Sequence, residues 1–342
     1  MLELRNVSKT FNAGTPLENK VITNLNLKIN DGEFITVIGG NGAGKSTMLN
    51  IISGAIDVDR GLILLNGYDI SRIHDYKRAP YFGRVFQDPM MGTAADMTIL
   101  ENLTLAYGRG RTRSPFRWFT KGKEKELFIE HLKSLDLGLE NRLHDKVGLL
   151  SGGQRQALTL LMSTIRKEPS IHSFKKIYGK ILKSSDEKMY NDILESFMRL
   201  NAEYKEIKKE IRHNKELKII EKREALYKAY RDYVSRISEV DPTRQILLLD
   251  EHTAALDPKT ANKVLEITDK IVKENHLTTI MITHNMKDAL KYGNRLIMMS
   301  KGKVVIDVKE EEKEKLEVND LLDLFSKASK DDYLSDATIL GD

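Results

Sequence analysis

Short apolar runs alternate with amphipathic stretches along most of the chain. Buried strands are predicted where the apolar runs are continuous, at residues 34–38, 246–249 and 279–282. A glycine-rich or polar turn and then a helical pattern follows each run, as at residues 258–273 and 286–292. Apolar strands that lead into helices favour a parallel α/β core, in which ligands bind at the carboxyl ends of the strands.

Three other regions have patterns of their own. Residues 98–140 are predicted to be helical with one basic interruption, and residues 309–342 to form an appended helix and tail. Residues 170–241 contain no proline and a single glycine, and their apolar residues recur every three or four positions. Because residues 212–216 break this repeat, the pattern predicts two amphipathic helices folded into an antiparallel hairpin.

The composition limits which cellular compartment and which kinds of binding site we expect. The chain has 342 residues, of which 40% are hydrophobic and 31% charged, and no apolar run approaches the roughly 18 residues of a membrane span. Its first residues lack a signal-peptide profile. The absence of cysteine excludes disulfides and thiolate metal sites. We therefore expect a cytosolic protein that contacts a membrane only through a partner.

A glycine-rich loop carries the first chemical signal. Its residues fit the P-loop pattern, with a predicted strand before it and a helix after it. Glycines let backbone N–H groups surround phosphates, and the start of a helix attracts anions. The lysine reaches the β- and γ-phosphates and the serine hydroxyl binds Mg²⁺. The predicted ATP-binding residues here are Gly39, Gly40, Asn41, Gly42, Ala43, Gly44, Lys45, Ser46 and Thr47.

A second signal is an apolar strand that ends in two acids, Asp250 and Glu251. A buried strand that presents carboxylates at its tip suits metal binding. Asp250 is predicted to hold Mg²⁺, through water, and Glu251 to orient and deprotonate the attacking water. Strand ends are often acidic, so the two acids indicate a catalytic metal site only in combination with the P-loop.

The sequence Leu-Ser-Gly-Gly-Gln at residues 150–154 identifies a narrower class. It resembles the signature of ATP-binding cassette (ABC) ATPases. Ser151 can cap the helix that follows, whose N–H groups then face an anion. The resemblance implies that Ser151, Gly152, Gly153 and Gln154 contact ATP bound to a second subunit, in a head-to-tail dimer with two ATP molecules between the subunits.

Further motifs follow in the family's order. Gln87 resembles the Q-loop glutamine that contacts Mg²⁺ or water, residues 255–257 resemble the D-loop, and His284 resembles the switch histidine at the γ-phosphate. Phe11 resembles the aromatic residue that stacks on adenine, although a lone aromatic after a strand is as often a core residue. The resemblance thus implies that Glu251, His284, Gln87 and Lys45 are catalytic and that Ser46, Gln87 and Asp250 bind the metal.

The resemblance covers the chain outside residues 170–241. It implies a P-loop NTPase of the ABC type, with a RecA-like core, an antiparallel β subdomain and a helical signature subdomain at about residues 88–168. The domain would span residues 1–308 with the hairpin inserted in it. The implied cofactors are ATP and Mg²⁺. The implied partners are membrane permease subunits, a second copy of the chain and, indirectly, an extracytoplasmic solute-binding protein, with no nucleic acid, at the cytoplasmic face of the membrane.

The expected function is the ATPase of a bacterial importer of a small solute such as an amino acid. Residues 92–103 and 250–257 are similar to those of importer ATPases of the tryptophan or tyrosine type. The alternative is a soluble ABC ATPase acting on ribosomes or DNA. Ribosomal members carry two cassettes in a chain, and DNA-associated members place a much longer coiled coil before the signature, so both are disfavoured.

Two features depart from the family pattern or stand outside it. His252 occupies the position of a proline, which we interpret as a tolerated variant with a freer turn; the alternative is a slightly altered D-loop or a pH-sensitive contact. Basic residues from Arg109 to Lys125 are interleaved with aromatic residues. Such a segment suits nucleic acid or the membrane surface beside a transporter, and its position favours the membrane. A solvated loop is the alternative.

Overall fold

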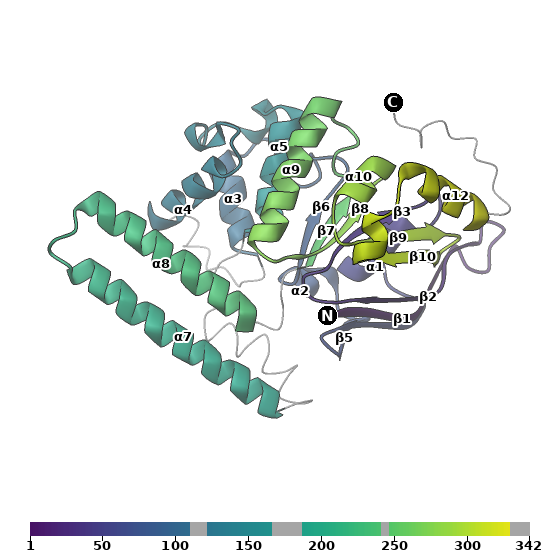
Figure 1. Cartoon of the computed structure of the whole chain (residues 1–342), viewed down its shortest axis with the longest axis horizontal. Helices are drawn as coiled ribbons and strands as arrows, with labels where there is room; N and C mark the ends of the chain where they lie inside the picture. Colours follow the sequence, from purple (N-terminus) through teal and green to yellow (C-terminus); the bar gives the residue numbers. More distant parts are fainter. Residues whose placement is uncertain (110–121, 166–186, 241–245, 329–342) are drawn as a thin grey trace. The chain divides into compact units, whose positions relative to one another are not determined.

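The computed structural model describes residues 1–109, 122–165, 187–240 and 246–328 (Figure 1). The chain forms two compact units, residues 1–166 together with 245–342, and residues 167–244. No helix in the described part of the chain is long and apolar enough to cross a bilayer.

Two sheets form the first unit. An antiparallel sheet has the order β2-β1-β4-β5, and a second sheet has the order β10-β9-β3-β8-β7-β6, in which only β10 runs antiparallel to its neighbour. The strands expected at residues 34–38, 246–249 and 279–282 are confirmed, and all three lie in the second sheet. The bounds are β1 (Leu2–Phe11), β2 (Asn19–Ile29), β3 (Phe34–Ile38), β4 (Arg60–Leu65), β5 (Tyr68–Asp69), β6 (Phe82–Val85), β7 (Ile246–Asp250), β8 (Thr278–Ile282), β9 (Arg295–Ser300) and β10 (Lys303–Lys309).

Helices cover both faces of the parallel strands. The bounds are α1 (Lys45–Ser53), α2 (Asp75–Arg78), α3 (Ile99–Tyr107), α4 (Gly122–Lys133), α5 (Gly152–Thr164), α9 (Pro258–Glu274), α10 (Met286–Lys291), α11 (Glu310–Glu314) and α12 (Val318–Ala328). Strand β7 is apolar on both faces because successive side chains alternate between two cores. Leu247 and Leu249 pack with α3, α4, α5 and α9, and Leu248 packs with α1 and the antiparallel sheet.

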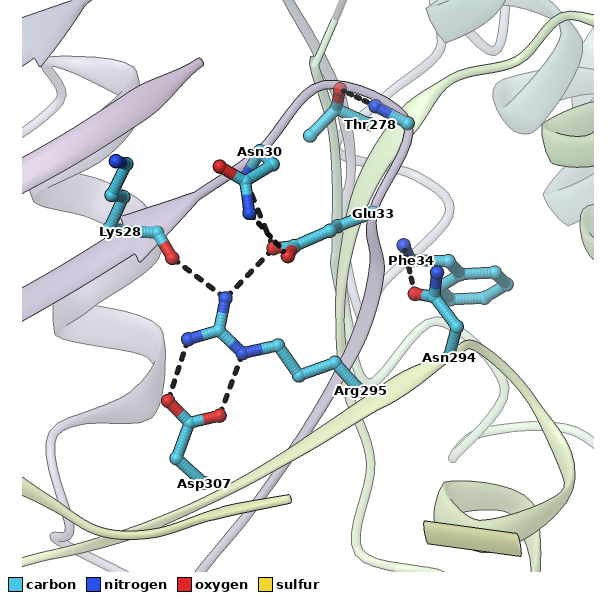
Figure 2. A network of polar contacts seen from close by, with 9 residues as sticks. Lys28, Asn30, Glu33, Phe34, Thr278, Asn294, Arg295 and Asp307 are labelled. Carbon is cyan, nitrogen blue, oxygen red and sulfur yellow. Dashed lines mark hydrogen bonds and ion pairs between the residues drawn. The ribbon is translucent and has the colours of Figure 1, made fainter. Parts of the chain in front are cut away.

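A polar network ties the two sheets together at the beginning of β9 (Figure 2). Arg295 is 4% exposed, and its guanidinium donates to both carboxylate oxygens of Asp307, to Glu33 and to the carbonyl of Lys28 at 2.6–2.8 Å. Lys28 belongs to β2, so this buried cation joins the antiparallel sheet to β9 and β10. Its donors are well satisfied, as the burial of a charge requires.

The second unit contains the helices α7 (Glu187–His213) and α8 (Ile219–Val240), which pack against each other. Phe197, Leu200, Tyr233 and Ile237 are buried. The rings of Tyr204 and Tyr233 stack with their centroids 4.5 Å apart. The first part of the predicted hairpin, residues 170–186, lies outside the described residues.

Candidate functional site

The phosphate-loop residues lie between β3 and α1, as the P-loop pattern predicts. Gly39 has φ 148°, and a Cβ there would lie 2.2 Å from the carbonyl oxygen of Met299, so only glycine allows β9 to pass this close. Gly44 has φ 95° and directly precedes Lys45, the first residue of α1. The loop therefore ends at a helix N-terminus, where unpaired N–H groups favour an anion.

Lys45 is the buried cation of this loop, with 5% of the residue exposed. Its Nζ donates to the carbonyl oxygens of Gly39 and Gly40 at 2.7 and 3.1 Å. Burial lowers the pKa of Lys45, and the nearby carboxylates of Glu251 and Asp250 oppose that effect. The loop thus holds its ammonium group inside the curve of the backbone, where a bound phosphate would meet it.

Ser46 and Asp250 meet at the beginning of α1 and the end of β7. The Ser46 hydroxyl donates to Oδ1 of Asp250 at 3.0 Å. Burial raises the pKa of Asp250, while the Ser46 hydrogen bond and the charge of Arg84 act in the opposite direction. The described residues contain no cluster of three or more His, Cys, Asp or Glu side chains suited to a metal. A hydroxyl and one carboxylate fit Mg²⁺, which keeps water and substrate phosphate as its other ligands.

Glu251 and His284 form the second polar pair, at the ends of β7 and β8. Nε2 of His284 lies 2.5 Å from Oε1 of Glu251. This hydrogen bond lowers the pKa of Glu251, against the effect of burial. Glu251 has φ 48°, a left-handed conformation that is costly for a residue with a Cβ. A carboxylate that stays ionised on a strained turn is suited to act as a base.

His252 is buried rather than free in the turn, with 2% of the residue exposed. Its Nε2 lies 3.1 Å from the hydroxyl of Thr268, which itself donates to the carbonyl of Val264. Because that hydroxyl has a single proton, His252 Nε2 is the donor to Thr268. Burial lowers the pKa of His252 to about 4. The expectation of a freer turn is therefore wrong. The ring stays neutral near pH 7, so the alternative of a pH-sensitive contact stays a prediction for acidic conditions.

The signature segment begins α5, and the predicted cap is confirmed. Ser151 Oγ accepts from the backbone N–H of Gln154, and the Gln154 side chain accepts from the N–H of Ser151. A Cβ at Gly153 would lie 2.1 Å from Cγ2 of Thr260 on α9. Asp257, from the D-loop motif, caps the N-terminus of α9 by accepting from Thr260. The signature and the D-loop thus form one packed junction.

Phe11 ends β1 and is partly exposed, with Lys9 Nζ 5.7 Å from its ring centroid. Its sheet packs behind the phosphate loop, because a Cβ at Gly44 would contact Ile22 of β2. The role of Phe11 at adenine stays a prediction.

A cleft of about 970 Å³ opens beside the metal-binding candidates. Gln87 is exposed and lines this cleft together with Asp250. The other lining residues include Tyr76 on α2, Asp88 and Met91 after β6, and Arg84 on β6. Sequence reasoning missed Arg84, whose Nη2 lies 3.7 Å from Oδ2 of Asp250. Its position one residue before the end of a strand was the available signal, because parallel strand ends share one edge of the sheet.

The expectation for the basic segment is wrong at its first residue. Arg109 donates to the carbonyl oxygens of Phe82, Ser163 and Met162. Burial lowers the pKa of Arg109 to about 10, so it stays charged while it caps the C-terminus of α5. It is a packing residue and not part of a membrane-facing surface. Residues 110–121, which contain most of that segment, lie outside the described residues.

Comparisons with known proteins identify relatives of this chain. The family described as ABC transporter matches residues 22–171. The tyrosine transport ATP-binding protein of Clostridioides difficile is 38% identical over 329 residues, which cover 96% of this chain and all of that protein. The phosphonates import ATP-binding protein PhnC of Lactococcus lactis is 26% identical, over 90% of this chain and 92% of the relative. The spermidine/putrescine import ATP-binding protein PotA of Haemophilus ducreyi is also 26% identical, and this chain covers 57% of it.

Solved structures show the same fold. A dimeric structure of the ATP-binding cassette MJ0796 bound to ADP and Pi superposes with a TM-score of 0.58 at 23% identity, covering 90% of this chain and 98% of that one. A nucleotide-free cassette from an ABC transporter gives a TM-score of 0.56 at 19% identity, covering 100% of this chain and 97% of that one.

Proposed function

The chain belongs to the ATP-binding subunits of ABC transporters, which couple ATP hydrolysis to transport, and we propose that it powers a bacterial importer of a small solute. The observation that supports this most is the meeting of three groups at one edge of the parallel sheet. Lys45 lies inside the phosphate loop, Asp250 accepts from Ser46, and Glu251 pairs with His284. Phosphoryl transfer to water needs these parts together.

Each group of site residues has its own role in binding and hydrolysing ATP. The N–H groups of residues 39–47 and the ammonium of Lys45 bind the phosphates. Ser46, Asp250 and Gln87 would hold Mg²⁺, which neutralises phosphate charge when bound. Glu251 orients water and accepts its proton, and the lowered pKa keeps the carboxylate ionised for that task. His284 holds Glu251 in place and faces the site where charge develops on the phosphoryl group.

The active unit is a dimer of two copies of this chain. The capped start of α5 presents the N–H groups that follow Ser151 to an anion. Within the subunit these groups belong to the junction with α9, and in the dimer they would face the ATP bound to the partner. Phe11 would stack on adenine. Cassettes of this fold dimerise, as the MJ0796 structure illustrates.

The cleft beside Gln87 is the proposed docking site for a membrane permease. Its rim combines large apolar side chains, Tyr76 and Met91, which are 65% and 69% exposed, with the acid Asp88. A short helical segment with an apolar side chain and a basic group would fit such a rim. The chain would therefore lie at the cytoplasmic face of the membrane and reach an extracytoplasmic solute-binding protein only through the permease.

For the solute, we propose tyrosine or a chemically similar aromatic amino acid. The support is the full-length relative that is named for tyrosine transport, while the relatives named for polyamine and phosphonate import share 26% identity with this chain. The cassette itself binds nucleotide and the permease, so the solute must be tested on the assembled transporter.

The experiment is affinity purification of the Glu251→Gln chain from detergent-solubilised native membranes with ATP and Mg²⁺. A multi-span membrane protein at stoichiometric level is expected, and the same bait without ATP serves as the control. The recovered complex is then placed in proteoliposomes, and uptake of labelled tyrosine is compared with uptake of spermidine and a phosphonate. Recovery of ribosomes or DNA in place of a membrane protein would support the soluble alternative.

A further inference from the structure

Arg295, Arg78 and Arg84 lie in the first unit with largely buried side chains, and they differ in how well their guanidinium groups are satisfied. Arg295 makes four hydrogen bonds of 2.6–2.8 Å (Figure 2). Arg78 is 1% exposed and donates four hydrogen bonds of 2.7–3.1 Å to carbonyl oxygens. The side chain of Arg84 is 17% exposed and has none as short. Arg84 is thus the exception.

The contacts of Arg84 are long. Nη1 donates to Ser53 Oγ at 3.4 Å, Nη2 lies 3.7 Å from Oδ2 of Asp250, and the guanidinium carbon is 4.5 Å from the ring centroid of Phe86. Its Nε is buried and has no hydrogen-bond partner among the residues that the structure describes. A buried donor without a partner is costly and calls for an explanation. The loose contacts indicate a side chain that can exchange partners at little cost.

Arg84 has neighbours from two proposed functional regions, the metal site and the permease cleft. On one side is Asp250, whose other oxygen accepts from Ser46. On the other side is the cleft, which Arg84 lines together with Phe86 and Gln87. The guanidinium therefore lies next to the carboxylate proposed for the metal, and both side chains line the space proposed for the permease. A cation at this place competes with a metal for Asp250.

We propose that Arg84 is a positioning residue that holds Asp250 until the cleft is occupied, and that a docked permease segment relieves this competition by accepting hydrogen bonds from Arg84. The proposal rests on the proposed function, because it takes a permease segment as the occupant. An acceptor oxygen on that segment, from a carboxylate or from the end of a helix, would accept from the guanidinium once the side chain turns towards the cleft, because Nε is itself buried. Asp250 would then be free for the metal, so that docking and metal binding favour each other.

The first test measures metal affinity on the whole chain without a permease. Mn²⁺ replaces Mg²⁺ because its unbound form is quantified by electron paramagnetic resonance, and a non-hydrolysable ATP analogue is present. Arg84→Gln is expected to bind Mn²⁺ about threefold to tenfold more tightly than the parent, the scale of a partly exposed ion pair. Arg84→Lys, which keeps the charge, should stay near the parent. Arg60→Gln removes an exposed charge on β4 and is the matched control.

Unchanged or weaker Mn²⁺ binding in Arg84→Gln would overturn the competition between Arg84 and the metal. Arg84→Met, which keeps the aliphatic stem against Phe86, is the second variant if Arg84→Gln does not fold. Nucleotide affinity measured in EDTA should be the same in all of these chains, which separates a metal effect from general damage.

The second test repeats the titration on the complex with its permease. The parent chain should bind Mn²⁺ more tightly in the complex than alone, and Arg84→Gln should show the same affinity in both. Equal affinity of the parent in both forms would overturn the coupling to the cleft. If no membrane protein is recovered at all, the proposed transport function fails, whereas the first test still decides whether Arg84 competes with the metal.

Discussion

Nε2 of His284 lies 2.5 Å from Oε1 of Glu251, and these two residues come from the ends of adjacent strands. The pair fixes a carboxylate on a residue with φ 48°. The hydrogen bond lowers the pKa of Glu251, so the carboxylate is available as a base throughout the physiological range. This pair gives the strongest support for a chemical role in the site, that of Glu251 as the base.

Glu251→Gln should lower kcat by about 100-fold or more, because the amide keeps the shape but cannot accept a proton. ATP affinity should stay within a few-fold of the parent, since the phosphate loop is untouched. Phosphate release measures kcat, a fluorescent ATP analogue measures affinity, and size-exclusion chromatography with ATP should reveal a trapped dimer. Glu311→Gln, at an exposed site, is the control. Substantial hydrolysis in Glu251→Gln would remove the base assignment.

Much of this site could be predicted because its parts are local in sequence. The phosphate loop, the acids after β7 and the signature cap each depend on residues within one short segment. Arg84 and Arg109 were missed or misread because their partners lie far along the chain. Arg109 donates to Phe82 and Ser163, and no local pattern distinguishes a buried arginine from an exposed one in a basic run.

His252 is a second case in which a contact with a distant residue could not be predicted from the sequence. Its replacement of a proline could be read from the sequence, and the loss of stiffness followed from that reading. The compensating hydrogen bond is donated by His252 to Thr268, a buried residue of α9 that lies sixteen residues later. Tertiary contact thus replaces the backbone restriction that a proline would supply.

The stability of the protein should depend on pH through His252. Its pKa is about 4 in the folded chain and 6.5 in the reference state, so the unfolded chain binds more protons between these values. Stability is then fully present above about pH 6.5 and is lost as the pH falls towards 4, by about 3 kcal/mol in total.

The measurement is urea unfolding from pH 4.5 to 7.5 on the parent and on His252→Gln. The free energy of unfolding of the variant should fall less steeply with acid than that of the parent. Thr268→Ser keeps the acceptor hydroxyl and should retain the parent's slope. Identical slopes for His252→Gln and the parent would contradict the assignment of a buried, neutral ring.

Gly153→Ala should destabilise the junction between α5 and α9, because the new Cβ would lie 2.1 Å from Cγ2 of Thr260. The expected loss is about 1–3 kcal/mol in the free energy of unfolding. Combining it with Thr260→Ser, which removes the methyl group, should recover most of that loss, and a double-mutant cycle measures the coupling. Additive effects of the two changes would mean that the contact is not what requires glycine.

Arg109→Gln should lower the free energy of unfolding by about 1–3 kcal/mol, since three carbonyl oxygens lose a charged donor. Membrane recovery of the folded fraction should not change, because the side chain is turned inward. Arg60→Gln, on the surface of β4, should change stability by about 0.5 kcal/mol or less. A stable Arg109→Gln chain that no longer associates with membranes would restore the membrane-facing interpretation.

Replacing residues 172–239 by a short Gly/Ser linker should leave the ATPase rate of the isolated chain within about twofold, because every proposed catalytic and binding residue belongs to the other compact unit. The hairpin has a buried apolar stripe of its own, with Phe197 and Ile237 inside it, so the cassette does not need it to complete its core. Phosphate release and thermal unfolding on the deletion variant measure both points.

The same variant distinguishes two roles for the hairpin. Met198 and Ile207 leave part of its surface apolar, at 50% and 37% exposure, which a partner subunit could cover or solvent could tolerate. Normal ATPase with lost assembly or transport would assign the hairpin to docking. Normal assembly and transport would leave it as a self-packed appendage. A fall in the ATPase rate of the isolated chain would contradict the separation of the two units, because it would show that the cassette depends on the hairpin for its own geometry.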